Sequence, residues 1–87
     1  ENGAVLIDVR ESHEYKNFHA PGAKLISLGV LERRLKEIPS EREILVVCQS
    51  GMRSSQAAGI LSKNGYQVKN VAGGMAAWQR AGLKVVR

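Results

Sequence analysis

Residues 46–59, VVCQSGMRSSQAAG, lead from an apolar run through a polar loop with a glycine into a helix-forming segment. The apolar run, residues 44–47, is short and follows polar residues, which is typical of a buried strand. From Ser54 or Ser55 onward the composition favours a helix, with serine as the N-cap and Gly65 as the stop signal. The stretch therefore predicts a strand, a tight loop and a helix.

Cys48 is the only cysteine of the chain, and it falls at the carboxyl end of this predicted strand. Backbone N–H groups at a helix start are unpaired and carry the positive end of the helix dipole. The pKa of a thiol falls beside such a helix start or a cation, and Arg53 supplies a cation nearby. Gly51 can adopt the positive φ that turns successive N–H groups toward one anion. We therefore expect the loop to hold an ionised sulfur and the anion that it meets.

Strand-like and helix-like segments alternate along the chain. The apolar patterns and turn residues predict strands at 4–9, 24–27, 44–47 and 67–71, and helices at 11–19, 28–38, 54–63 and 75–81. The helix over 28–38 is the clearest, because its leucines and isoleucine repeat at helical spacing. This alternation predicts crossover connections, and hence an α/β fold with a small, mainly parallel sheet flanked by helices on both faces. Ligands of such sheets bind beyond the carboxyl ends of the strands, where we expect Cys48.

The size and cysteine content narrow the classes of protein. A chain of 87 residues is sufficient for one domain, so residues 1–87 are interpreted as a single unit. One cysteine excludes an internal disulfide and a cysteine-rich metal site, and it favours a reducing compartment. We therefore expect a cytoplasmic location, although the sequence leaves a cleaved export signal open. No apolar run approaches the roughly 20 residues of a spanning helix, so we expect no membrane insertion.

The formal net charge of +5 is compatible with nucleic-acid binding but does not require it. Arg33, Arg34 and Lys36 alternate with Glu32 and Glu37, which is typical of a solvated helix face. Aromatic residues make up only 5% of the chain, so the basic and aromatic surface of many nucleic-acid-binding modules is not indicated. We therefore expect no nucleic-acid partner. A basic surface would equally steer small anions toward a site.

Four segments, in this order, resemble the rhodanese-like family of the single-domain sulfurtransferase type. They are Leu6-Ile7-Asp8-Val9-Arg10-Glu11, His19-Ala20-Pro21-Gly22-Ala23, the loop from Cys48 to Ser54, and Val71-Ala72-Gly73-Gly74-Met75-Ala76-Ala77-Trp78. Each segment alone is a weak signal, but the ordered set is specific and extends over nearly the whole chain. The sequence departs from the family pattern at Phe18, where members usually have glycine. It also lacks the strand and helix that usually precede the first segment.

The resemblance implies an enzyme of the thiosulfate sulfurtransferase type. Its cysteine takes the outer sulfur of thiosulfate or a persulfide, and passes that sulfur from a cysteine persulfide to a thiol or cyanide. Cys48 matches the nucleophile, and Arg53 matches the partner of the oxyanion and the thiolate. Independently of the resemblance, the position of Arg10 after a predicted strand places it at the mouth of the same site as a supporting residue. The loop that holds the persulfide and the incoming anion matches Gln49, Ser50, Gly51, Met52, Arg53 and Ser54. No metal or organic cofactor is implied, and the expected acceptor is a thiol such as glutathione or a thioredoxin-like protein.

Two other functions remain open at this stage. Cysteine phosphatases also place a thiolate and an arginine around an anion-binding loop, but they resemble Cys-X5-Arg, whereas Cys48 and Arg53 form Cys-X4-Arg. The shorter loop should suit a sulfane sulfur better than a phosphate ester. A non-catalytic or sulfur-receiving module of a larger protein is the second alternative. The presence of the cysteine, Gly51 and Arg53 argues against a module that has lost its chemistry.

Other polar and aromatic residues have structural explanations. Asp8 and Arg10 follow a predicted strand, where such residues commonly form an ion pair. His13 lies in a polar segment and is expected at the surface. His19 precedes Ala-Pro-Gly and is expected to fix that turn by a hydrogen bond. Trp78, on a short predicted helix, is expected to pack in the core.

Overall fold

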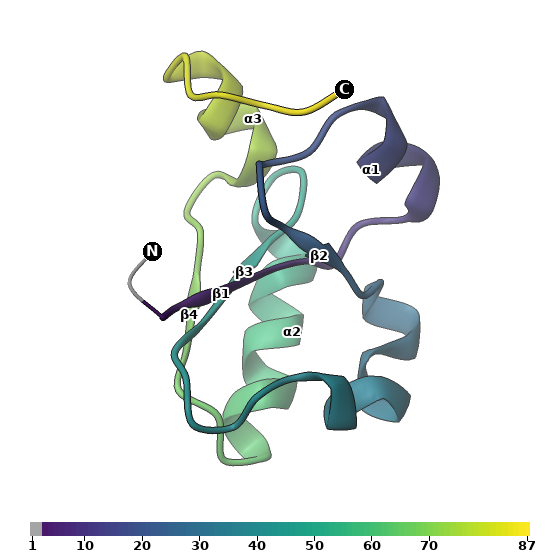
Figure 1. Cartoon of the computed structure of the whole chain (residues 1–87), viewed down its shortest axis with the longest axis vertical. Helices are drawn as coiled ribbons and strands as arrows, with labels where there is room; N and C mark the ends of the chain where they lie inside the picture. The colour runs from purple at the N-terminus through teal and green to yellow at the C-terminus, as the bar shows by residue number, and fades with distance from the viewer. Residues whose placement is uncertain (1–2) are drawn as a thin grey trace.

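The computed structural model describes residues 3–87, which form an α/β fold around one four-stranded sheet (Figure 1). The strands are β1 (Val5–Asp8), β2 (Lys24–Leu25), β3 (Ile44–Val47) and β4 (Val68–Asn70). They lie in the order β2-β1-β3-β4, and every neighbouring pair is parallel. The predicted parallel sheet is therefore confirmed, with each strand shorter than or equal to its predicted range.

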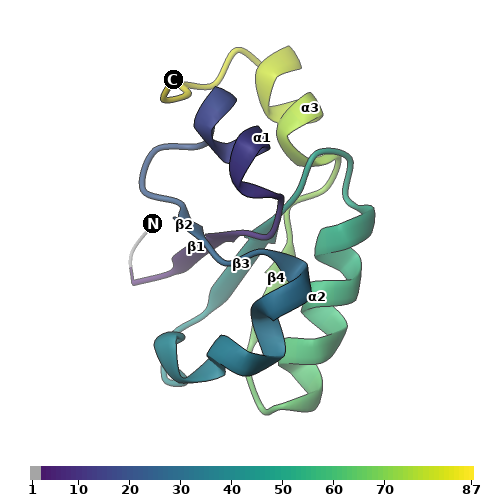
Figure 2. The same ribbon diagram turned by 90° about the vertical axis from the view of Figure 1, so that its right-hand side faces the viewer.

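The strands are connected by α1 (Ser12–Asn17), η1 (Leu28–Glu37) and α2 (Met52–Lys63), and α3 (Gly74–Arg80) follows β4. Figure 2 shows α2 and η1 on one side of the sheet. The same view shows α1 and α3 close together at the end of the molecule where the loop between β3 and α2 lies. The three elements α1, α2 and α3 thus meet around the segment that begins with Cys48.

The two faces of the sheet pack into two separate core clusters. Ile7 of β1 and Val46 of β3 face α2 and η1, where they pack with Leu61 among others. On the opposite face, Val47 packs against Met75 of α3 and a group of residues from α1 and the segment after it. This division follows from strand geometry, because successive side chains point to opposite faces. The unbroken apolar sequence of β3 therefore reflects burial on both faces.

The helix predicted over 28–38 is present as η1, and its type, which the prediction left open, is 3₁₀. Arg34 has a non-helical backbone (φ −115°, ψ 19°), which interrupts η1 near its end. The apolar spacing that predicted this helix includes steps of three residues, which fit a 3₁₀ helix as well as an α-helix. The Tyr66 hydroxyl lies 3.0 Å from the carbonyl oxygens of both Leu35 and Ile38, which share its single proton, and it so ties the end of η1 to the segment after α2.

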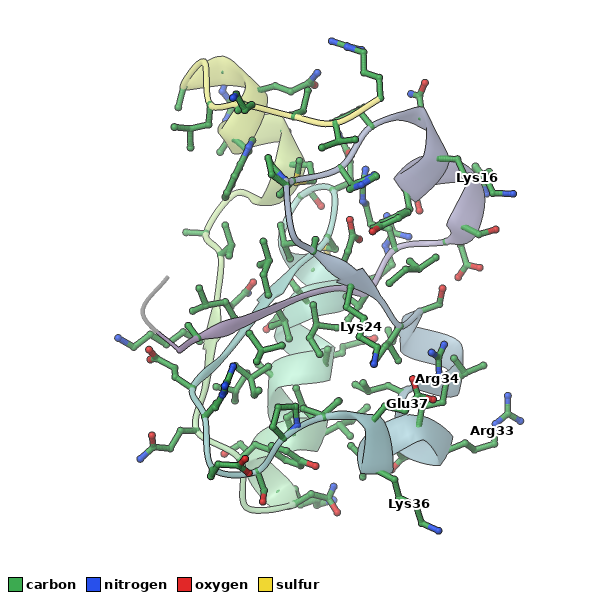
Figure 3. All side chains as sticks on the ribbon, in the orientation of Figure 1. Lys16, Lys24, Arg33, Arg34, Lys36 and Glu37 are labelled. Atoms are coloured by element: carbon green, nitrogen blue, oxygen red, sulfur yellow. The ribbon has the colours of Figure 1, made fainter. Side chains whose placement is uncertain are left out.

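Basic side chains from α1, β2 and η1 occupy one side of the molecule (Figure 3). The labelled residues are Lys16, Lys24, Arg33, Arg34, Lys36 and the acidic Glu37. Glu37 accepts two hydrogen bonds from Arg34, at 2.7 and 2.8 Å, and lies 3.4 Å from Lys24. The hydrogen bonds from Arg34 hold the pKa of Glu37 at about 2, and Lys24 adds to this effect. The charges thus partly compensate one another on a solvated face, as the sequence predicted.

Among residues 3–87, no helix has both the length and the apolar composition needed to span a membrane.

Candidate active site

The thiol of Cys48 lies where β3 ends, and only 1% of this residue is exposed. Gly51, with φ of +108°, turns the chain into α2. This turn brings the N–H of Gly51 to 3.0 Å from the Cys48 Sγ, to which it donates. The Ser54 hydroxyl lies 3.4 Å from the same sulfur. The loop therefore folds back on its own thiol, as its glycine and its place before a helix predicted.

Gly51 is also the N-cap of α2, which corrects the prediction of a serine cap at Ser54 or Ser55. The helix begins at Met52, and the Ser55 N–H donates to the Gly51 carbonyl within its first turn. Glycine at the N-cap leaves the first N–H groups of the helix without a side-chain acceptor. Ser54 is thereby left to interact with the sulfur.

The beginning of α3 holds the carbonyl groups of the thiol loop. The N–H of Met75 donates to the Cys48 carbonyl at 2.7 Å, and the N–H of Ala76 donates to the Gln49 carbonyl at 3.0 Å. These contacts require α3 to start against the loop backbone, and Gly74 supplies the space and the positive φ of +61°. With the carbonyls fixed on α3, the loop presents N–H groups to the sulfur.

The pKa of Cys48 is lowered from its ordinary value. Burial raises this pKa, but the hydrogen bond from the Ser54 hydroxyl and the backbone N–H groups of Ser54, Gly51 and Ser50 together lower it by more. Each of these donors stabilises the thiolate over the thiol. The thiolate is the nucleophilic form of cysteine, so the surroundings of Cys48 favour nucleophilic attack by its sulfur on a substrate.

Asn70 is a residue of this site that the sequence did not indicate. Its Oδ1 lies 2.6 Å from the Ser54 hydroxyl oxygen, so Asn70 and the Cys48 sulfur share the single proton of that hydroxyl as alternative acceptors, and its Nδ2 donates to the Gly51 carbonyl at 3.2 Å. Asn70 ends β4 and pairs in register with Val46 of β3. Only that register brings it beside the loop, so no local sequence signal could have identified it.

Replacing Ser54 by alanine is expected to raise the pKa of the Cys48 thiol. The substitution removes one donor to the thiolate and leaves the opposing effect of burial in place. A smaller fraction of the thiol would then be ionised at neutral pH, and its alkylation would require higher pH. The pH dependence of iodoacetamide alkylation, followed by intact mass, measures the shift. Ser55→Ala, at an exposed neighbour, is the control; equal pH profiles for the two variants would contradict the role of Ser54.

Arg53 does not hydrogen-bond to the thiol, although the sequence predicted it as the partner of the thiolate. Its two terminal nitrogens donate to the two carboxylate oxygens of Glu14 on α1, at 2.7 and 2.8 Å. This hydrogen bonding holds the pKa of Glu14 at about 2 and raises the pKa of Arg53. The Cys48 charge contributes to the shift of Arg53 as well. Arg53 is thus close enough to act on the thiolate electrostatically, while its donors are directed at Glu14.

Arg10 is buried and forms an ion pair with Asp8, with nitrogen–oxygen distances of 2.9 to 3.1 Å. It also donates to the Phe18 carbonyl at 2.7 Å and to Oε1 of Gln49 at 3.3 Å. Its guanidinium carbon lies 5.2 Å from the centroid of the Phe18 ring. The expected Asp8–Arg10 pair is confirmed. Arg10 reaches the loop through the Gln49 side chain, which is a way for it to support the site without contacting the sulfur.

The other predicted residues lie around the loop or away from it. Ser50 is exposed, and Met52 is 77% exposed, so its side chain lies on the outer surface of the site. His19 makes a structural hydrogen bond, as predicted, but its side chain contacts α1 rather than the Ala-Pro-Gly turn: its Nδ1 lies 2.8 Å from the Tyr15 carbonyl and its ring stacks on Tyr15 at 3.7 Å. His13 is exposed, as expected.

A cavity of about 300 Å³ lies on the sheet face opposite α2, and Cys48 is not among its lining residues. It is lined by Ala4, Leu6, Pro21, Gly22, Leu45, Val71 and Trp78. Trp78 is therefore only partly packed in the core, and its Nε1 donates to the Lys84 carbonyl at 2.8 Å. The cavity and the thiol loop are separate features of the fold.

Comparison with known proteins identifies the family. The family model of the rhodanese-like domain matches residues 1–81, and the chain belongs to this family. A rhodanese-related protein from Thermoplasma volcanium has a similar structure, with a TM-score of 0.93 and 28% sequence identity. The similarity covers 98% of this chain and 85% of that one.

Two curated relatives are bacterial proteins with names that refer to sulfur. A sulfurtransferase from Allochromatium vinosum is 37% identical over 83 residues, which cover 94% of this chain and 78% of that protein. The putative sulfur carrier protein YrkF from Bacillus subtilis is 43% identical over 74 residues. Those residues cover 84% of this chain and only 40% of that protein.

Proposed function

We propose that this chain is a sulfurtransferase in which Cys48 accepts a sulfane sulfur as a cysteine persulfide and passes it to a thiol or to cyanide. The observation that carries the proposal is the buried Cys48 Sγ, which receives the N–H of Gly51 at 3.0 Å and lies 3.4 Å from the Ser54 hydroxyl. Membership of the rhodanese-like family and similarity to a sulfurtransferase support a role in sulfur transfer.

The first half-reaction takes sulfur from thiosulfate or from a persulfide. The Cys48 thiolate attacks the outer sulfur of the donor, and a new sulfur–sulfur bond forms. The bond between that sulfur and the rest of the donor breaks, and its electron pair leaves with sulfite or with a thiolate. The N–H groups of the loop are fixed before the reaction, so they stabilise the new persulfide anion without reorganising.

The second half-reaction returns Cys48 to its thiolate. An acceptor thiolate, such as that of glutathione or a thioredoxin-like protein, attacks the outer sulfur of the Cys48 persulfide. The exposed positions of Ser50 and Met52 place this end of the loop at the molecular surface, where an acceptor can approach. We assign substrate contact to residues 49–54, an electrostatic role to Arg53 and a supporting role to Arg10 through Gln49.

The two alternatives have different requirements. A phosphatase would need the loop to surround a tetrahedral phosphate, which the Cys-X4-Arg spacing and the engagement of Arg53 by Glu14 both disfavour. A sulfur-receiving module of a larger protein would use the same thiol chemistry. The observation in favour of that second role is the similarity to the putative sulfur carrier protein YrkF, because the similar region covers only 40% of YrkF.

Sulfur uptake tests the proposal directly. The reduced protein is incubated with thiosulfate or with glutathione persulfide, freed of excess donor and measured by intact mass. We expect a gain of about 32 Da that a thiol removes, and no gain in Cys48→Ser. If the folded protein takes up no sulfur from either donor, sulfur transfer is excluded. If Cys48→Ser takes up sulfur as well, Cys48 is not the carrier.

A further inference from the structure

The ion pair between Arg53 and Glu14 bears on which sulfur donor the site accepts. Arg53 stands at the start of α2, next to the thiol loop, and Glu14 belongs to α1. Their two hydrogen bonds, at 2.7 and 2.8 Å, join both terminal nitrogens to both carboxylate oxygens. A guanidinium uses this same bidentate fork to bind a sulfonate or phosphate. These two hydrogen bonds use the pair of Arg53 donors that forms such a fork, and a substrate oxyanion would have to displace Glu14 to use that pair.

Glu14 is held in place from its own helix as well. Its Oε1 accepts the N–H of Glu11 at 2.9 Å, which is half of a capping box at the start of α1. The carboxylate is thus fixed by one partner on each side, and it loses little further freedom by binding Arg53. It also keeps its charge at all ordinary pH values, since its pKa is held at about 2. Glu14 is therefore a permanent competitor for the Arg53 guanidinium.

The second arginine near the loop is not available for an oxyanion either. Arg10 is 1% exposed, and its Nε and one terminal nitrogen are bound to Asp8, with Phe18 taking a further bond. Its other terminal nitrogen faces Gln49. Both arginines that approach the thiol loop within the described residues are thus matched by carboxylates of the chain itself. What the loop offers an incoming donor is its backbone N–H groups, which carry partial charges only.

Thiosulfate and persulfides make different demands on such a site. Both place a sulfane sulfur against the Cys48 thiolate, but thiosulfate also brings a sulfonate and releases sulfite, a second anion. When a persulfide gives up its outer sulfur, the leaving group is a thiolate, and protonation of that thiolate to a thiol removes its charge. A neighbouring cation strengthens the binding of the sulfonate, which carries a full charge, whereas the loop N–H groups can hold the persulfide sulfur without one.

We infer that Glu14 sets the donor preference of this domain: by occupying Arg53, it disfavours thiosulfate relative to persulfide donors. The inference rests on the sulfur transfer proposed above and adds the substrate class. Glu14 is a specificity-determining residue that acts through Arg53. When Glu14 is neutral, Arg53 is free to bind the sulfonate, and the preference shifts toward thiosulfate.

The experiment compares two donors on Glu14→Gln and on the unaltered protein, with single-turnover sulfur uptake followed by intact mass. Glutamine retains the helix-capping hydrogen bond but not the charge, so the variant keeps α1. We expect the second-order rate constant for thiosulfate to rise at least about tenfold, the scale of one charge-assisted hydrogen bond. The rate constant for glutathione persulfide should change by less than about twofold on the same scale.

Glu41→Gln is the matched control, since it removes one negative charge in the exposed segment before β3, at the opposite end of that strand from Cys48. It should alter neither rate constant. The gain in Glu14→Gln should disappear when Arg53→Ala is added. An unchanged ratio of the two donors, an equal rise for both, or a gain that survives loss of Arg53 would overturn the inference while leaving sulfur transfer intact. Absence of uptake from both donors in every variant would instead refute sulfur transfer itself.

Discussion

Gly74→Ala is expected to destabilise the domain by about 2–5 kcal/mol and to slow sulfur uptake strongly. A Cβ at this position would lie 2.3 Å from the Cys48 carbonyl oxygen and 2.6 Å from the carbonyl atoms of Gln49. All of these are backbone atoms, so no side-chain rotation relieves the overlap. The positive φ of +61° adds strain of roughly 1–2 kcal/mol for any residue with a Cβ, and overpacking of this kind typically adds about 1–3 kcal/mol.

The effect on the site follows from the hydrogen bonds at the start of α3. If the beginning of α3 moves away, Met75 and Ala76 lose the Cys48 and Gln49 carbonyls, at present 2.7 and 3.0 Å from their N–H groups. The loop N–H groups would then no longer be held toward the sulfur. Urea denaturation measures the loss of stability, and intact mass after brief exposure to glutathione persulfide measures uptake.

Gly82→Ala separates the close approach from backbone strain. Gly82 also has a positive φ, +75°, but a Cβ there would meet no atom within 4 Å. The Gly82→Ala variant should therefore lose only roughly 1–2 kcal/mol of stability, through backbone strain, and keep normal sulfur uptake. If the two glycine variants lose equal stability and react equally fast, the docking of α3 on the thiol loop is not what Gly74 provides.

The sequence predicts those parts of the fold that depend on residues close together in the chain. The apolar run of β3, the glycine at 51 and the helix after it define the strand, loop and helix that hold Cys48. The alternation of predicted strands and helices was sufficient to predict a parallel sheet. The type of η1 was not predictable from spacing, since leucines three apart fit a 3₁₀ turn as well as an α-helix. The helix cap was assigned to serine because serine is a common N-cap, but here a buried Ser54 serves the thiol instead.

The partners of the predicted site residues depended on long-range contacts. Arg53 was correctly placed beside the loop, but its pairing with Glu14 requires α1 and α2 to meet, which no spacing encodes. Asn70 reaches Ser54 only because β4 pairs with β3 in one register. The Asp8–Arg10 ion pair could be predicted from the sequence, because its two residues are only two positions apart at the end of a strand. The sequence thus indicated Cys48 as the candidate reactive residue, and tertiary structure determines which charged groups beside it are already paired.

The Asp8–Arg10 pair gives the other large expected effect, since Asp8→Ala should destabilise the domain by about 3–5 kcal/mol. Asp8 is fully buried, and its carboxylate accepts the Nε and one terminal nitrogen of Arg10, besides the Arg10 backbone N–H at 3.0 Å. Without Asp8, the buried guanidinium would keep its charge with only neutral partners. Small domains have a total stability of about 5–15 kcal/mol, so a large part of it would be lost.

Thermal or urea unfolding measures this loss, and two further variants identify its cause. Glu37→Ala breaks an exposed ion pair and should shift the unfolding midpoint little, because solvent screens that pair. Asp8→Leu combined with Arg10→Met replaces the buried charges by apolar groups and should recover much of the stability lost in Asp8→Ala. The double variant should still take up sulfur more slowly, because Gln49 has lost its contact with Arg10. Recovery of stability together with full uptake would limit Arg10 to folding, whereas recovery of stability alone would make it a positioning residue for the thiol loop.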